Sequence, residues 1–232
     1  MKINVLPDAN SAAKAGAAFV AAEARASAKA RGRFAFAVSG GHTPWLMLAA
    51  LAHEPIPWED VHVVQVDERI APLGDPDRNL THLRESLLAH SPLREERIYA
   101  MPVESPDLEA AAASYATTLK EIAGSPPVLD LVHLGLGPDG HTASLIPGDP
   151  VLTVTDVDVA VTGVYQARRR MTLTYPVLNR ARRILWLVTG DEKAEMLSRL
   201  MQGDQSIPAG CVSQERAVVI ADRAAASQLA LR

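Results

Sequence analysis

The chain has 232 residues, 48% of them apolar, and a formal net charge of −4 at pH 7. This length fits one generous domain or two small ones, and the apolar fraction suffices for a substantial core, so we expect a single domain spanning residues 1–232. The one cysteine, Cys211, excludes an intramolecular disulfide. The 23 basic residues are spread along the chain, which argues against a nucleic-acid-binding surface.

No charged and apolar leader opens the sequence, so we expect a cytoplasmic location. The longest apolar stretches, such as residues 184–189, are far shorter than the roughly 20 residues that a membrane span requires, and no membrane anchor is expected. Because the basic residues are not clustered, any bound anion should be small and held locally. The sequence leaves the choice between a monomer and a weak homo-oligomer open.

From the N-terminus onward, short β-rich runs alternate with longer alanine-rich segments of helical period. This alternation is typical of a parallel sheet covered by helices, and near-continuous apolar runs fit strands buried on both faces. The expected strands span residues 3–6, 34–38, 61–66, 129–134, 184–188 and 218–220. The expected helices span residues 10–30, 44–52, 80–89, 107–123, 191–201 and 223–231. The predicted class is α/β, with a doubly wound, mostly parallel sheet flanked by helices.

Residues 150–175 depart from this alternation. Alternating Val and Thr residues are followed by three arginines and a second alternating segment, 171–174. This pattern predicts a small extra strand pair outside the main sheet. Nearer the C-terminus, Asp191 and Asp222 stand at the starts of the last two predicted helices, and we expect them to cap those helices.

The second predicted strand runs directly into the sequence Ser-Gly-Gly-His-Thr-Pro and then into a helix. Gly40 and Gly41 let the backbone approach a ligand, and Pro44 suits the first helical position. An anion there would meet free N–H groups and the positive end of the helix dipole, with hydroxyl donors from Ser39 and Thr43. The alternative is a plain tight turn capped by Thr43. No Gly-Lys-Ser/Thr follows, so the pattern favours a sugar phosphate over a nucleotide triphosphate.

Residues 134–148 follow the fourth predicted strand. Because the carboxyl ends of parallel strands face the ligand crevice, this segment and the first glycine loop should share one edge of the sheet. Gly137 lets the main chain approach a substrate, and Asp139 stands close enough to orient His141, a residue type suited to general-base work. A solvated turn is the alternative for this histidine alone, but its pairing with the first glycine loop favours catalysis. The other histidines lack such a polar context.

A third polar element, Asp67-Glu68-Arg69, ends the third predicted strand. Asp67 and the nearby Asn79 are expected to bind sugar hydroxyls, and Arg69 to neutralise a phosphate or a developing oxyanion. For Glu68 we favour a structural ion pair with a nearby arginine. The spacing of His, Cys and carboxylate residues indicates no zinc site, and no metal is expected.

Two basic residues are weaker candidates for phosphate contacts. Arg170 enters the 171–174 segment, and Lys193 stands beside a turn at Gly190. A solvated basic face explains the neighbouring Arg168 and Arg169 equally well.

These motifs together resemble the 6-phosphogluconolactonase family, which shares its fold with the glucosamine-6-phosphate deaminases. The resemblance spans nearly the whole chain and is carried by residues 39–44, 67–69, 135–148 and 170–174, Gly190, Lys193, Pro208 and Asp222. It implies a deaminase-type parallel sheet, cleavage of 6-phospho-D-glucono-1,5-lactone to 6-phosphogluconate in the pentose phosphate pathway, and no organic cofactor. The chain departs from the family pattern at His42, Arg78 and Ile146, and it lacks a tryptophan often seen near residues 218–224.

Lactone opening requires an activated water, a stabilised oxyanion and a hold on the distant phosphate. We expect His141 to act as the base, Asp139 to position His141 or the substrate, and Arg69 with loop amides to receive the negative charge. Ser144 lacks the Gly-x-Ser-x-Gly setting of a nucleophilic serine, and we reject that role.

Two other functions compete with this one. A deaminase or isomerase of the same fold requires a further acid-base group, but residues 142–147 contain no carboxylate. A sugar-phosphate sensor is expected to carry a DNA-binding segment, for which we see no room before Phe34, and it would leave the Asp139/His141 pair idle.

Overall fold

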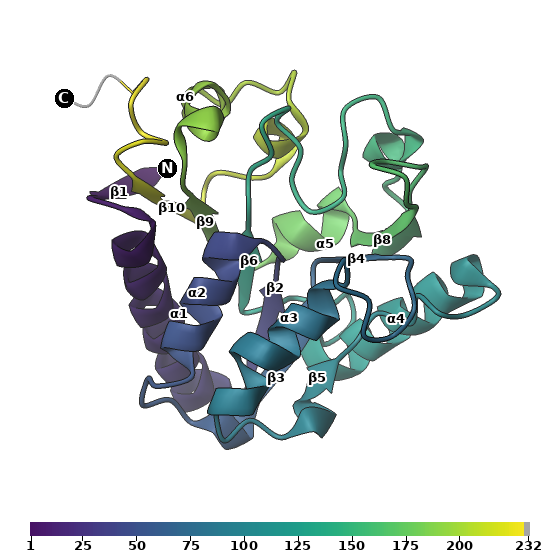
Figure 1. Ribbon diagram of the computed structural model, residues 1–232. Coiled ribbons are helices and arrows are strands. Elements are labelled where there is room, and N and C mark those ends of the chain that lie inside the picture. The colour runs from purple at the N-terminus through teal and green to yellow at the C-terminus, as the bar shows by residue number, and fades with distance from the viewer. Residues whose placement is uncertain (230–232) are drawn as a thin grey trace.

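The computed structural model describes residues 1–229, and its centre is a sheet of seven parallel strands in the order β1–β10–β9–β6–β2–β3–β5 (Figure 1). After β2, the chain adds β3 and β5 on one side and then β6, β9 and β10 on the other. This reversal beside β2 is a topological switch point, where loops leaving neighbouring strands diverge and leave a crevice. The strands are β1 (Lys2–Leu6), β2 (Phe34–Val38), β3 (Val61–Gln65), β5 (Ile98–Tyr99), β6 (Leu131–Leu134), β9 (Ile184–Val188) and β10 (Ala217–Asp222).

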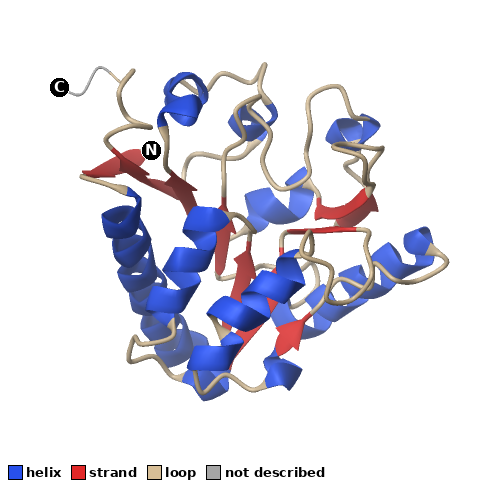
Figure 2. Cartoon of the chain, viewed as in Figure 1, coloured by secondary structure: helices blue, strands red, loops and turns tan. Residues whose placement is uncertain are grey.

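Helices cover both faces of this sheet (Figure 2). One face packs against α1 (Ala9–Arg31), α2 (His42–Leu51) and α3 (Asn79–Ser86), and the core on the other includes α4 (Leu108–Ala123), α5 (Tyr175–Arg180) and α6 (Ala194–Met201). Side chains alternate between the faces, so that Phe34 and Phe36 pack toward α1 while Ala35 and Ala37 join the opposite core. The predicted α/β class is confirmed. Within residues 1–229, no helix has both the length and the apolar character needed to cross a membrane.

All six predicted strands are present, with small shifts at their ends. The two-residue edge strand β5 was not predicted, because two residues are too few to show a period. Helix α5 was also missed, since it is only six residues long and follows directly on a strand.

A second, antiparallel sheet is formed by β4 (Asp67–Arg69), β8 (Arg170–Leu173) and β7 (Val159–Val161), in that order. The predicted extra strand pair is therefore confirmed, and β4 joins it as a third strand. The chain changes sheets at Val66, whose N–H donates to Val38 O in the main sheet (3.0 Å) and whose carbonyl accepts from Leu173 N in the small one (2.8 Å). As a result, Asp67 and Arg69 belong to the small sheet and not to the end of β3.

The prediction of a helix over residues 223–231 is wrong for the part that the structure describes. Residues 223–229 form consecutive turns and a bend, and residues 230–231 lie outside the described residues. Asp222 accepts from Ala225 N (2.8 Å), as a cap would, but it also accepts from Gly190 N (3.1 Å) and so ties the ends of β9 and β10 together. The predicted Asp191 cap is wrong as well, because Asp191 lies inside a 3₁₀ turn, Asp191–Lys193, that precedes α6.

Helix α3 begins against a buried carboxylate from β4. Both oxygens of Glu68 face the free N–H groups of the first turn, accepting from Asn79 N (2.8 Å) and Leu80 N (2.9 Å). Arg78, itself buried, brings its Nε to within 3.2 Å of Glu68 Oε2. The predicted structural ion pair of Glu68 is thus confirmed, and it is almost completely shielded from solvent.

The same carboxylate also holds the end of β3. Glu68 Oε2 accepts from Gln65 Nε2 (2.8 Å), and Glu68 Oε1 accepts from Arg69 N (2.8 Å). Gln65 in turn accepts from Met101 N through Oε1 (2.8 Å). One side chain therefore joins β3, β4 and α3.

We expect Glu68→Gln to destabilise the fold by about 3–5 kcal/mol, because the change removes the buried counter-ion of Arg78 and leaves it only the exposed Glu104, 3.9 Å away. The amide nitrogen of the new glutamine would also face N–H groups that at present donate to the Glu68 carboxylate. Urea unfolding followed by circular dichroism measures this loss.

Glu85→Gln is the matched control. The side chain of Glu85 is 67% exposed and pairs with His82 one turn earlier on the same helix, so its loss should change the free energy of unfolding by less than about 0.5 kcal/mol. Equal stability of the two variants would contradict the role assigned to Glu68.

Candidate active site

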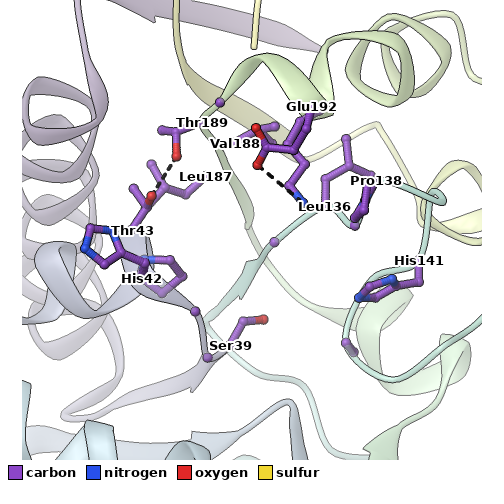
Figure 3. Close-up of a pocket in the computed structure, with 18 of the residues that line it drawn as sticks. Ser39, His42, Thr43, Leu136, Pro138, His141, Leu187, Val188, Thr189 and Glu192 are labelled. Carbon is purple, nitrogen blue, oxygen red and sulfur yellow. Dashed lines mark hydrogen bonds and ion pairs between the residues drawn. The ribbon is translucent and has the colours of Figure 1, made fainter. Parts of the chain in front are cut away.

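A cavity of about 600 Å³ opens at the carboxyl edge of the sheet, where the loops after β2, β6 and β9 meet (Figure 3). Its volume is in the range of small-molecule sites. In Figure 3, His141 lies across the cavity from Thr43, with Ser39 between them. The candidate residues that line the cavity are Ser39, Gly40, Gly41, Thr43, Asp67, Arg69, Asn79, Gly137, His141, Arg170 and Lys193. Asp139, the remaining candidate, lies behind this lining.

The loop after β2 depends on its two glycines. A Cβ on Gly40 would lie 1.9 Å from Asn79 Oδ1, so the backbone comes closer to α3 than any side chain allows. Gly41 has a φ of +121°, a conformation that favours glycine, and it forms the N-cap of α2. The loop therefore turns tightly into the helix.

Helix α2 begins earlier than the sequence predicts, at His42, so that Pro44 is its third residue. Its first intrahelical bond runs from Trp45 N to Gly41 O (3.1 Å), which leaves the preceding N–H groups for an anion. Thr43 does not cap the helix. Its Oγ1 lies 2.6 Å from Thr189 Oγ1 and so joins this loop to the end of β9 (Figure 3).

A buried histidine supports the loop from below. Ser39 Oγ donates to His133 O (3.0 Å), and Ser39 N donates to His133 Nδ1 (3.3 Å). Burial lowers the pKa of His133 to about 3, so its imidazole stays neutral and can accept this bond. His133 was expected to lack a polar context, so its contact with Ser39 was not predicted.

In the loop after β6, Asp139 and His141 form a close pair. Nδ1 of His141 lies 2.5 Å from Asp139 Oδ1. A carboxylate only accepts, so Nδ1 carries the proton and Nε2 is left with a free lone pair. The imidazole occupies the space beside Gly137, where a Cβ would lie 2.1 Å from Nδ1.

The charge of Asp139 is stabilised by its neighbours. Burial alone would raise its pKa, but interaction with the His141 imidazole and hydrogen bonds from His141 and Tyr165 together lower it. Tyr165 OH donates to Asp139 Oδ2 (3.1 Å). Both carboxylate oxygens are therefore held.

Asp67 lies buried at the floor of the cavity. Its Oδ2 accepts from Ser144 Oγ (2.6 Å), and its carbonyl accepts from Asn79 Nδ2 (3.0 Å). Ser144 is fully buried, so a ligand in the cavity does not reach its hydroxyl. Asn79 also accepts from Arg69 Nη1 through Oδ1 (3.0 Å), which fixes the guanidinium at the cavity wall.

Arg170 stands next to Arg69 in the same wall. Burial lowers the pKa of Arg170, and the charge of Arg69 lowers it further, against the opposing charges of Asp67 and Asp139. The Nε atoms of Arg69 and Arg170 are both buried without a partner among the described residues. Two neighbouring cations with unused donors suit an anionic group.

Lys193 lies beside the loop after β9. Its Nζ is 3.8 Å from Glu192 Oε1, an ion pair that Figure 3 marks at the cavity edge. Five polar lining residues were not predicted as part of the site: His42, which was noted only as a departure from the family pattern, and Gln166, Thr189, Glu192 and Asp222. Asp222 was noted as a helix cap and as part of the family resemblance, and the other three carry no motif. Within residues 1–229, no group of three or more His, Cys, Asp or Glu side chains is arranged to hold a metal ion.

Comparison with known proteins agrees with this architecture. A family model described as glucosamine-6-phosphate isomerases/6-phosphogluconolactonase matches residues 7–221. A Synechocystis protein named 6-phosphogluconolactonase is 41% identical over 174 residues, covering 73% of this chain and 72% of that protein.

Two solved structures share the fold. The 6-phosphogluconolactonase of Trypanosoma brucei superposes with a TM-score of 0.86 at 25% identity, over 99% of this chain and 98% of that one. A monomeric glucosamine-6-phosphate deaminase, at 20% identity, shares the fold with a TM-score of 0.85 over 99% of this chain and all of the other. The expected deaminase-type sheet is thus confirmed. The chain belongs to the family of glucosamine-6-phosphate isomerases and 6-phosphogluconolactonases.

Proposed function

We propose that this protein hydrolyses 6-phospho-D-glucono-1,5-lactone to 6-phosphogluconate in the oxidative pentose phosphate pathway, in the cytoplasm, with His141 as the general base. One observation carries the proposal: the Asp139-paired imidazole of His141 opens into the same cavity as the glycine loop at Ser39 to Thr43. The relatives named 6-phosphogluconolactonase support the choice of substrate.

In this mechanism Nε2 of His141 takes a proton from water while the oxygen attacks the lactone carbonyl. Arg69 at the cavity wall, with loop amides, receives the charge of the tetrahedral oxyanion. When the intermediate collapses, the bond from the carbonyl carbon to the ring oxygen breaks. The imidazolium returns its proton to that oxygen, which becomes the C5 hydroxyl. The new carboxylic acid ionises, so each turnover releases one proton to solvent.

The far end of the substrate is its phosphate. We assign it to the start of α2, where free N–H groups and the hydroxyls of Ser39 and Thr43 are available, with Lys193 as counter-ion. Asp67, Asn79 and Gly137 lie between the two ends and are assigned to the sugar. Arg170 lies beside Arg69 and is assigned, with it, to the negative charge that develops on the carbonyl oxygen. Holding the phosphate fixes the carbonyl near the base.

Deamination of an amino-sugar phosphate is the second activity in this family, and it requires a further acid-base group near the histidine. Residues 142–147 contain no carboxylate. Among the other carboxylates of the cavity, Asp67 accepts from Ser144, Asp222 accepts from Gly190, and Glu192 pairs with Lys193. These contacts favour the lactonase.

The direct test follows acid release from freshly prepared 6-phosphogluconolactone at neutral pH, relative to the spontaneous rate, with glucosamine 6-phosphate as the second substrate. Acceleration with the lactone alone supports the proposal. Ammonia release from glucosamine 6-phosphate, without lactone turnover, would overturn it.

Replacing His141 with glutamine should lower kcat by about 10²- to 10⁴-fold, the usual contribution of a general base. Binding of 6-phosphogluconate, measured by calorimetry, should stay within about threefold because the substituted amide is still polar and the phosphate contacts are elsewhere. His53→Gln, at an exposed position outside the cavity, is the control and should retain full turnover. Near-normal turnover of His141→Gln would remove this histidine from the mechanism.

Lys193→Met should weaken binding of 6-phosphogluconate about tenfold or more while leaving gluconate binding unchanged, since only the former carries a phosphate. Raising the salt concentration should weaken 6-phosphogluconate binding to the wild type more than to the variant. Lys14→Met, an exposed change on α1, is the control. An equal loss for both ligands would place the phosphate elsewhere.

A further inference from the structure

Tyr165 contacts the Asp139/His141 pair from outside the cavity lining. Its hydroxyl donates to Asp139 Oδ2 (3.1 Å), while Asp139 Oδ1 lies 2.5 Å from His141 Nδ1. The two rings meet edge to face, with centroids 5.6 Å apart and planes inclined by 66°. Burial raises the pKa of Tyr165, and the charge of Asp139 raises it further, so the hydroxyl keeps its proton and remains a donor.

The ring of Tyr165 is in turn held by Arg170. The guanidinium carbon lies 5.0 Å from the ring centroid, within the range of a cation–π contact. Arg170 Nη2 also donates to Gln166 Oε1 (3.1 Å), on the next residue along. Arg170, which lines the cavity, therefore contacts the loop that carries Tyr165.

This loop makes its turn at an energetic cost. Tyr165 and Arg168 pair across it through two backbone hydrogen bonds of 2.9 and 3.2 Å. Between them, Gln166 and Ala167 both adopt positive φ values, +49° and +64°. Two-residue hairpins of this form prefer Asn-Gly, because side chains other than glycine and asparagine are strained at positive φ. Contacts with the rest of the protein must offset this strain.

Arg168 supplies such contacts on the other side of the hairpin. Its Nη2 lies 3.1 Å from Asp75 Oδ2, and its Nε donates to Asp77 Oδ2 (2.9 Å). Asp77 O accepts from Arg69 Nη1 (2.7 Å), so the anchor continues into the cavity wall. The hairpin is therefore fixed at Asp139 and at the loop before α3.

We propose that Tyr165 is a positioning residue, which orients the Asp139 carboxylate and thereby presents the free nitrogen of His141 to the substrate. Holding Oδ2 prevents the carboxylate from rotating, so that Oδ1 stays on Nδ1. The inference rests on the proposed general-base role of His141. No motif in the sequence marks Tyr165.

Tyr165→Phe tests this role, since it removes the hydroxyl and keeps the ring over which Arg170 lies. We expect kcat for 6-phosphogluconolactone to fall about tenfold with KM within about twofold, the loss of one hydrogen bond to a charged group.

The same variant should change the pH profile of kcat. The acid limb should move to higher pH, because a carboxylate without its tyrosine donor holds the imidazolium proton more strongly. The other charged group that faces this cluster among the described residues is Arg170, which in turn interacts with Arg69 and Asp67, and the substitution leaves all three in place.

Nuclear magnetic resonance provides a readout that does not depend on turnover. In the wild type, the Nδ1 proton of His141 should give a downfield signal, assigned by its loss in His141→Gln. In Tyr165→Phe the carboxylate is free to rotate, so this signal should broaden. Lactone turnover by the wild type tests the proposed function separately. A failure of the lactonase proposal can therefore be told apart from a failure of the role assigned to Tyr165.

Tyr175→Phe is the matched control. Tyr175 OH also donates one hydrogen bond, to Pro208 O (2.9 Å), but it lies outside the cavity lining. Its variant should keep the wild-type kcat, acid limb and downfield signal. Tyr165→Phe with wild-type values of all three would overturn the proposal, as would equal effects of the two substitutions.

Discussion

The carboxylate of Glu68 is the buried charge on which the candidate site depends. It is enclosed at the junction of β3, β4 and α3, and it accepts from backbone and side-chain donors of all three elements. A buried carboxylate without these partners would be strongly destabilising, so the three elements can meet in only one way. Asp67 and Arg69 flank Glu68 on β4, and Asn79 begins α3. Their places in the cavity wall follow from the position of this one charge.

Close backbone packing sets the other side of the cavity. β2 and β6 are neighbours at the switch point, so their following loops must share one edge of the sheet. Gly40 leaves room for Asn79, and Gly137 leaves room for the ring of His141. In both cases a functional side chain fills the volume that a Cβ would occupy. At these two positions the site requires the absence of a Cβ and not the flexibility of the backbone.

The sequence predicted the elements that have a strong local signal. Buried strands such as β2 and β9 appear as continuous apolar runs, and both glycine loops were placed at the correct edge. The residues that were missed depend on contacts distant in sequence. Tyr165 contacts Asp139 only once the β7–β8 hairpin has folded back. Arg78 was noted only as a departure from the family pattern, because its partner Glu68 lies in another element. The alanine-rich segment after Asp222 has helical propensity, but its described part forms turns beside a carboxylate that joins β9 to β10.

The neutral imidazole of His133 has a consequence for the behaviour of the two ends of the cavity in acid. Because its pKa is only about 3, the support beneath Ser39 is unchanged over the whole range of pH that a cell encounters. His141, at the opposite end, is partly exposed, so the two histidines differ in their access to solvent. The loop that starts at Ser39 therefore keeps its hydrogen bonds to His133 in acid, and its shape does not depend on the charge at the other end of the cavity.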